Sequence, residues 1–112
     1  MMKTELLHGT LEVLILKILS WGPMHGFGVG RRIEQLSENE LRIEEGSLYP
    51  ALYRLEKKGW VESSWGVSDN QRRAKFYRLT PRGRRQLLEN TDTWSAFAKA
   101  VARVLSATHQ PA

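Results

Sequence analysis

The sequence contains no cysteine, which excludes disulfides, thiolate zinc sites and cysteine nucleophiles. Its three histidines, His8, His25 and His109, lie far apart and lack the spacing of metal ligands. No glycine loop of the kind that cradles phosphate is recognisable, and no nucleophile, base and acid form a convergent set. We therefore expect neither an enzyme with catalytic residues nor a protein that binds a metal or a cofactor.

A long hydrophobic run is also absent. The most apolar stretch, "LEVLILKILSW", includes Glu12 and Lys17 and is too short to span a bilayer. The first ten residues, "MMKTELLHGT", lack the small-residue cleavage site of a signal peptide. We expect a cytoplasmic protein that does not interact with membranes.

Acidic residues are missing from one part of the chain. The 112 residues carry a net charge of +5, which favours an anionic partner such as nucleic acid. Residues 72–85 include seven basic residues and no acid, whereas the charged residues of 34–45 are mostly acidic, five glutamates and one arginine. Such one-sided charge is typical of phosphate binding, although a charge run can also be a solvated face.

The hydrophobic periodicity predicts three helices, a β-hairpin and a long final helix. The first helix begins at Leu6 or Thr10 and ends at Ser20, and the second covers Gly26–Ser37. The third has Ser47 as its N-cap, or begins near Glu45, and ends at Gly59. Strands over Trp60–Val67 and Ala74–Thr80 form the hairpin. Thr80 and Pro81 then begin a helix that continues to about Thr108.

This order of elements is typical of a winged helix-turn-helix. The predicted fold is therefore mainly α with a small β-hairpin, followed by a long C-terminal dimerisation helix. We assign residues 1–80 to a DNA-binding domain and residues 81–112 to the dimerisation helix. In the hairpin we expect Phe76 and Leu79 to face the core and Tyr77 to alternate outward.

The third predicted helix has an unusual outer face. Leu48, Leu52 and Leu55 form an apolar stripe, whereas Tyr49 and Tyr53 lie on the other side beside basic residues. Tyrosine can bond to phosphate or to a base edge, so this face is a candidate reading surface; alternatively, the tyrosines pack half-buried against a neighbouring element. The predicted DNA contacts are Ser47, Tyr49, Tyr53, Arg54, Lys57, Lys58, Arg72, Arg73 and Lys75.

The final helix has an apolar stripe with the spacing of a coiled coil, which predicts a two-fold homodimer. The predicted dimer interface consists of Leu11, Leu14, Leu87, Thr91, Trp94, Val101 and Leu105. Trp94 either fills this interface or, with Phe97 and Ala98, bounds a cavity for a flat aromatic ligand.

The stretches "GSLYPALYRLEKKGW" and "RRAKFYRLTPRG", together with "LHGTLEVLILKIL" and "GPMHGFGVGRRI", resemble the PadR family of bacterial transcriptional regulators. The similarity covers about residues 7–105 and is to the short subgroup with a single C-terminal helix. It implies a homodimeric regulator, usually a repressor, with a reading helix over Gly46–Lys58 and wing residues at the DNA backbone. Some members release DNA on binding aromatic ligands near a tryptophan placed like Trp94. The second helix departs from the family pattern at Gly28 and Gly30.

We therefore expect a dimeric repressor of two-fold symmetric double-stranded DNA, with a small aromatic effector as an open possibility. The alternative is a winged helix that binds proteins and not DNA. The basic, tyrosine-rich reading face favours DNA.

Overall fold

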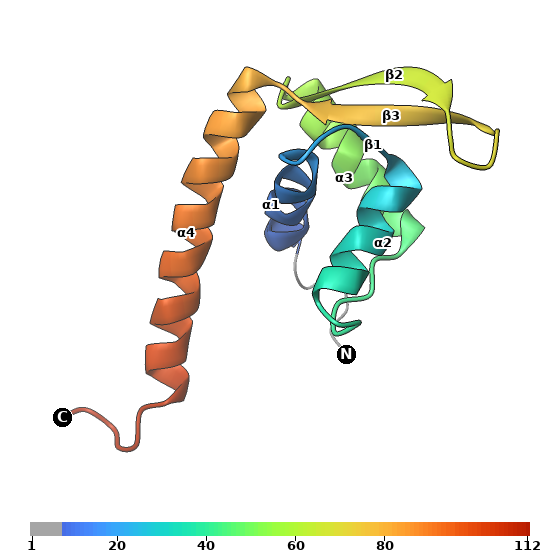
Figure 1. Cartoon of the computed structure of the whole chain (residues 1–112). Helices are drawn as coiled ribbons and strands as arrows, with labels where there is room; N and C mark the ends of the chain where they lie inside the picture. Colours follow the sequence, from blue (N-terminus) through green and yellow to red (C-terminus); the bar gives the residue numbers. More distant parts are fainter. Residues whose placement is uncertain (1–7) are drawn as a thin grey trace.

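The first half of the chain, in which apolar residues recur with helical periodicity, forms three helices that pack against one another (Figure 1). The computed structural model describes residues 8–112. The helices are α1 (His8–Leu19), α2 (Gly26–Leu36) and α3 (Glu45–Lys57). Their bounds agree with the sequence prediction to within about two residues, except that the alternative start of the first helix at Leu6 lies outside the described residues.

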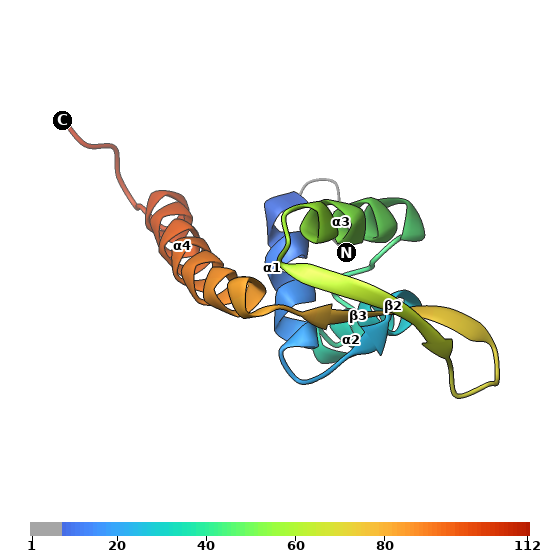
Figure 2. The same ribbon diagram turned by 90° about the horizontal axis from the view of Figure 1, so that it is seen from above.

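A three-stranded antiparallel sheet covers these helices, with the strand order β1-β3-β2. The predicted hairpin is formed by β2 (Val61–Val67) and β3 (Arg73–Leu79). Its edge is extended by β1 (Met24–His25), which pairs with Tyr77 and Phe76 and was not predicted. The hairpin continues beyond the helices as a projecting wing (Figure 2). The fold is therefore the predicted winged helix-turn-helix, with one additional short strand.

The core lies between the three helices and the inner face of the sheet. The largest fully buried side chains are Ile15, Leu16, Leu19, Val29, Leu52, Leu55 and Val61. Tyr77 also belongs to this core and is only 6% exposed, so the prediction that it faces outward is wrong. Side chains alternate along a strand, so Tyr77 shares the inner face with Leu79. Phe76 is half-buried on the other face, where its ring lies 5.7 Å from that of His25.

The start of α3 corrects a second detail. Glu44 is the N-cap and Glu45 the first helical residue, so Ser47 is not the cap. The alternative start near Glu45 is therefore the correct one, and it places Pro50 inside the helix. Proline has no amide hydrogen to donate to the carbonyl of Gly46 four residues earlier. Gly46 is exposed, so that carbonyl is in a position to bond water.

Glycines in α2 allow α3 to approach closely. A Cβ at Gly30 would lie 3.1 Å from Leu48 Cδ2, and one at Gly26 would lie 2.7 Å from Tyr49 Cε1. His25 caps this helix because its Nδ1 accepts a hydrogen bond from the Gly28 amide at 3.0 Å. Close packing and the cap offset the conformational freedom that glycine brings to a helix.

The last helix, α4 (Pro81–Leu105), begins as predicted and ends three residues before the expected Thr108. Thr80 Oγ1 accepts from the Gly83 amide at 3.0 Å and donates to the Gly59 carbonyl at 2.7 Å. The 25 residues of α4 extend over about 37 Å. The helix leaves the domain on the side opposite the wing (Figures 1 and 2). Much of the surface of α4 is therefore not covered by the rest of the chain.

Candidate nucleic-acid interface

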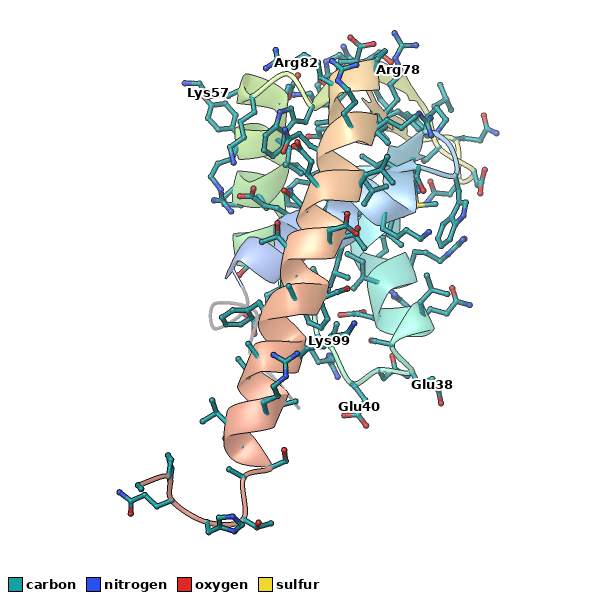
Figure 3. The ribbon with its side chains drawn as sticks, turned by 90° about the vertical axis from the view of Figure 1, so that its left-hand side faces the viewer. Glu38, Glu40, Lys57, Arg78, Arg82 and Lys99 are labelled. Carbon is teal, nitrogen blue, oxygen red and sulfur yellow. The ribbon has the colours of Figure 1, made fainter. Side chains whose placement is uncertain are left out.

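The outer face of α3 presents a tyrosine and a lysine side by side. Tyr53 is 61% exposed, and the Lys57 ammonium lies 5.4 Å from the centre of its ring. Both are on the side of α3 opposite the buried leucines. Lys57 points away from the domain at its outer edge (Figure 3). The prediction that this face is exposed is confirmed, while its contact with DNA stays a prediction.

Tyr49 combines exposure with packing. It is 41% exposed, and its ring edge lies against Gly26 of α2. Burial raises the pKa of the Tyr49 phenol, and the charge of Glu45 raises it further. The hydroxyl therefore stays protonated at neutral pH and can donate a hydrogen bond to phosphate or to a base. Ser47 is half-buried in the first turn, where its amide donates to the Glu44 carbonyl at 3.0 Å.

Two of the predicted DNA contacts, Arg54 on α3 and its C-cap residue Lys58, are held by an acid on α1. Arg54 Nε donates to Glu12 Oε2 at 3.0 Å, and Lys58 Nζ donates to Glu12 Oε1 at 3.1 Å. The Glu12 side chain is only 12% exposed, so this carboxylate is largely shielded from water. The Lys58 ammonium also lies 4.6 Å from the centre of the Trp60 ring. Arg54 and Lys58 thus join α3 to the rest of the domain, a role that the sequence did not reveal.

The wing carries an exposed aromatic residue that the sequence analysis did not select. Trp65 is 60% exposed, and the Arg73 guanidinium lies 4.4 Å from the centre of its ring. Arg72 is exposed beside it at the end of the hairpin turn. Strand alternation puts Trp65 on the same face as the buried Val61, so the sequence contains no signal that this tryptophan is exposed; the hairpin projects beyond the helices that cover this face closer to the domain (Figure 2). A stacked ring and guanidinium can pack against a sugar or base while adjacent cations contact phosphate.

Lys75 lies closer to the helices than Arg72 and Arg73 do, and it contacts other residues of its own chain. Its ammonium is 3.7 Å from Glu56 Oε1 on α3 and 5.8 Å from the centre of the Tyr77 ring. Among the described residues, Lys57, Arg72 and Arg73 take part in no ion pair. The basic residues predicted to contact DNA therefore divide equally: three are paired within the chain and three are not.

The charges of the domain are separated in space. Lys57, Arg78 and Arg82 lie toward the upper end of the molecule in Figure 3, whereas Glu38 and Glu40 lie at the lower end of the winged domain, at about the level of Lys99 on α4. Such a separation orients an approaching polyanion toward the end that carries α3 and the wing.

A groove separates α4 from α1, with a volume of about 670 Å³. Trp94 stands in its wall and donates from Nε1 to Thr10 Oγ1 at 2.9 Å. A second recess of about 540 Å³ also borders this tryptophan and includes Phe97. Ala98 is half-buried on the next turn. The residues of the first groove are Thr10, Val13, Leu14, Lys17, Leu41, Leu87, Leu88, Thr91, Asp92 and Trp94.

The residues predicted for the dimer interface do not all lie on the surface. Leu11 is 3% exposed in the core of its own chain, so it offers almost no surface to a partner. Leu14 and Leu87 are partly buried against that core. The other predicted residues are exposed along α4, namely Thr91, Trp94, Val101 and Leu105.

Within residues 8–112, no cluster of histidine and acidic side chains could hold a metal ion. No helix in the same range is long and apolar enough to cross a membrane.

Comparison with known proteins agrees with this geometry. Residues 15–89 match the PadR-like family of transcriptional regulators. A transcriptional regulator of Mycobacterium tuberculosis is 38% identical over 68 residues, which are 61% of this chain and 63% of that protein. The structure of a transcriptional regulator from Clostridium thermocellum has a TM-score of 0.79 and 27% identity, with 88% of this chain and 96% of that chain covered.

A PadR-like transcriptional regulator from Bacillus cereus has a TM-score of 0.74 and 28% identity, with 92% of this chain and 98% of that chain covered. The chain therefore belongs to the PadR-like family of transcriptional regulators, and it is a regulator and not an enzyme.

Proposed function

We propose that the protein is a homodimeric repressor that binds two-fold symmetric double-stranded DNA. Each chain presents α3 to the major groove and the wing to the flanking backbone. The observation that carries the proposal is the joint exposure of Tyr53, Lys57, Arg72 and Arg73 on these two elements. We assign residues 1–80 to the DNA-binding domain and residues 81–112, which include α4, to dimerisation.

The exposed stripe of α4 supports the dimer. Phe97 is 65% exposed and Val104 is 75% exposed, and Leu88 and Leu105 are similarly bare. Large apolar side chains in such number on one helix mark a surface that a partner covers. A second copy of the same helix, related by a two-fold axis, has the complementary stripe. The two α3 helices then meet half-sites one helical turn, or a multiple of it, apart.

The groove beside Trp94 supports regulation by a small aromatic ligand. Its volume is in the range of sites for small molecules, and leucine, valine and tryptophan side chains dominate its wall. A ligand between α1 and α4 favours one spacing of the two α3 helices over another. If that spacing does not match the half-sites, the ligand releases the DNA by a shift in population.

Fluorescence anisotropy tests the proposal directly. The purified protein is titrated against its own upstream DNA and a scrambled duplex at two salt concentrations. We expect salt-dependent binding with a preference for the upstream DNA. Absence of binding to either duplex at low salt would contradict the proposal and favour the alternative, a winged helix that binds proteins.

Sedimentation equilibrium tests the dimer with a matched pair of variants. Val101→Lys places a charge in the stripe, whereas Ala96→Lys places the same charge on an exposed position away from it. We expect Val101→Lys to weaken self-association at least tenfold and Ala96→Lys to leave it unchanged. Equal self-association of the two variants would show that the α4 stripe is not part of the interface.

A further inference from the structure

Glu56 lies at the junction between α3 and the wing. Its Oε2 accepts a hydrogen bond from Ser63 Oγ on β2 at 2.6 Å. Its Oε1 lies 3.7 Å from Lys75 Nζ on β3. Ser63 is paired with Tyr77, and Lys75 with Trp65, so both contacts come from the inner face of the sheet. One carboxylate therefore connects α3 to both strands of the wing.

The surroundings of Glu56 restrict its movement. The side chains of Glu56 and Lys75 are 33% and 39% exposed, and the buried Tyr77 lies beside them. The Lys75 ammonium also contacts the Tyr77 ring at 5.8 Å. The pKa of the Tyr77 phenol is raised by burial and, to a smaller extent, by the charge of Glu56. The phenol, the carboxylate and the ammonium thus form one group between helix and sheet.

The other acid of the wing offers a contrast. Glu62 accepts a hydrogen bond from Arg78 Nε at 2.7 Å, and both side chains are more than half exposed. Glu62 and Arg78 are opposite each other on β2 and β3, so this pair lies within the hairpin. It does not connect the wing to α3. Glu56 and Glu62 therefore carry the same charge on neighbouring parts of the structure. Only Glu56 connects the helix to the wing, whereas Glu62 connects the two strands of the wing to each other.

Glu56 is also adjacent in the chain to Lys57, which is on the exposed face of α3. A protein that contacts the major groove with a helix and the flanking backbone with a hairpin must hold the two at a fixed separation. When the separation is already correct in the free protein, less conformational freedom is lost on binding. A wing that moves independently of α3 can still contact phosphate, but it does so equally well on any sequence.

We propose that Glu56 is a positioning residue for DNA recognition, which holds the wing at a fixed angle to α3 and keeps Lys75 in the domain. This inference rests on the proposed DNA binding and adds to it the device that sets sequence preference. Lys75 is then a tether of the wing and not a phosphate contact.

The test uses a duplex that the wild-type protein selects from a random library, together with a scrambled duplex. Affinity for both is measured over a range of salt concentrations for wild type, Glu56→Gln and Glu62→Gln. Each variant loses one negative charge, so any general gain in DNA affinity is common to the two. We expect the ratio of selected to scrambled affinity to fall about tenfold in Glu56→Gln and to change less than about twofold in Glu62→Gln.

Two further variants separate position from charge. Ser63→Ala removes the 2.6 Å hydrogen bond without a change in charge, and we expect it to lower the same ratio with an unchanged salt dependence. Lys75→Gln should also lower the ratio and leave the salt dependence unchanged. If it reduces the logarithmic salt slope by about 0.9 for each chain, Lys75 contacts phosphate and the proposal is overturned.

The outcomes are distinguishable from failure of the proposed function. A wild-type protein that selects no duplex contradicts DNA recognition itself. A wild-type protein that does select one, with equal ratios for Glu56→Gln and Glu62→Gln, contradicts only the role of Glu56. Circular dichroism verifies that each variant is folded. If Glu56→Gln does not fold, Ser63→Ala decides the question alone.

Discussion

The Glu12 carboxylate provides a quantitative test of how α3 is held in the domain. Replacement by glutamine keeps the size of the side chain but removes the charge shared by Arg54 and Lys58. An exposed ion pair contributes about 0–1 kcal/mol, whereas breaking a fully buried pair costs about 3–5 kcal/mol. Glu12 is 12% exposed and its partners are 33% and 44% exposed, so the site lies between these limits.

A second observation raises the expected cost. Arg54 Nη2 is buried, and among the described residues it has no hydrogen-bond partner. Arg54 therefore has little spare capacity to replace the bond that it loses, and its guanidinium is left partly desolvated. We expect Glu12→Gln to lower the free energy of unfolding by about 2 kcal/mol. The corresponding fall in melting temperature is roughly 8 °C for a domain of this size.

The measurement is urea unfolding followed by circular dichroism, at one fixed protein concentration because dimerisation also affects apparent stability. Glu62→Gln is the matched control, since Glu62 loses the same charge from an exposed pair with Arg78. We expect it to change the free energy of unfolding by less than about 0.5 kcal/mol. If the two variants lose equal stability, the Glu12 contacts are ordinary surface pairs, and the reasoning from burial is refuted.

Two more predictions concern the core. Gly83→Ala should lower the free energy of unfolding by at least about 2 kcal/mol, because the new Cβ would overlap the Trp60 carbonyl oxygen. Gly46→Ala is the control, since its Cβ would meet nothing within 4 Å. We expect it to be neutral or stabilising in the same urea titration. The pKa of Tyr77 is raised above its ordinary value of 10.0 by burial, so the unfolded phenol ionises first as the pH rises. The contribution of Tyr77 to stability should therefore be constant below about pH 10 and fall above it. Tyr77→Phe should reduce the loss of stability above about pH 10, and an identical profile for both proteins in that range would contradict the prediction.

Local sequence signals predicted the elements of this fold well. The leucine and isoleucine spacing located α1 and α2, and Thr80 with Pro81 located the first turn of α4. These features depend on residues within one or two turns of each other. The start of α3 was less certain because Ser47 is of a residue type that caps helices, whereas the helix begins after Glu44, whose side chain makes no cap hydrogen bond.

The two errors in the sheet, the faces of Phe76 and Tyr77 and the missed strand β1, have different physical origins. Phe76 and Leu79 are three residues apart, whereas a strand alternates every two, so they cannot share a face. Tyr77 and Leu79 do share one, and the core has room for the tyrosine ring. The strand β1 is only two residues long and is defined by its partner β3, far away in the sequence. Its own residues contain no periodic signal that could have predicted it.

The roles of the basic residues could not be predicted from local sequence. Arg54 and Lys58 bind Glu12, which is 42 and 46 positions away along the chain. Any of several acids could have been the partner, and the choice depends on how α1 packs against α3. The exposure of Tyr53 and Lys57, in contrast, follows from their position opposite the leucine stripe of the same helix. The contact face was therefore easier to predict than the charges available on it.

This division of charge determines how strongly binding to DNA should depend on salt. Composition alone offers six basic side chains for each chain at the predicted contacts, namely Arg54, Lys57, Lys58, Arg72, Arg73 and Lys75. With all six on phosphate, a dimer would neutralise twelve phosphates, and the logarithmic salt slope would be about −11. Three of these cations are paired with Glu12 and Glu56 inside the chain, which leaves six for a dimer. We therefore expect a slope near −5 for these contacts. A slope near −11 would contradict this expectation and show that further cations contact phosphate, as they would if DNA replaced Glu12 and Glu56 as partners of Arg54, Lys58 and Lys75.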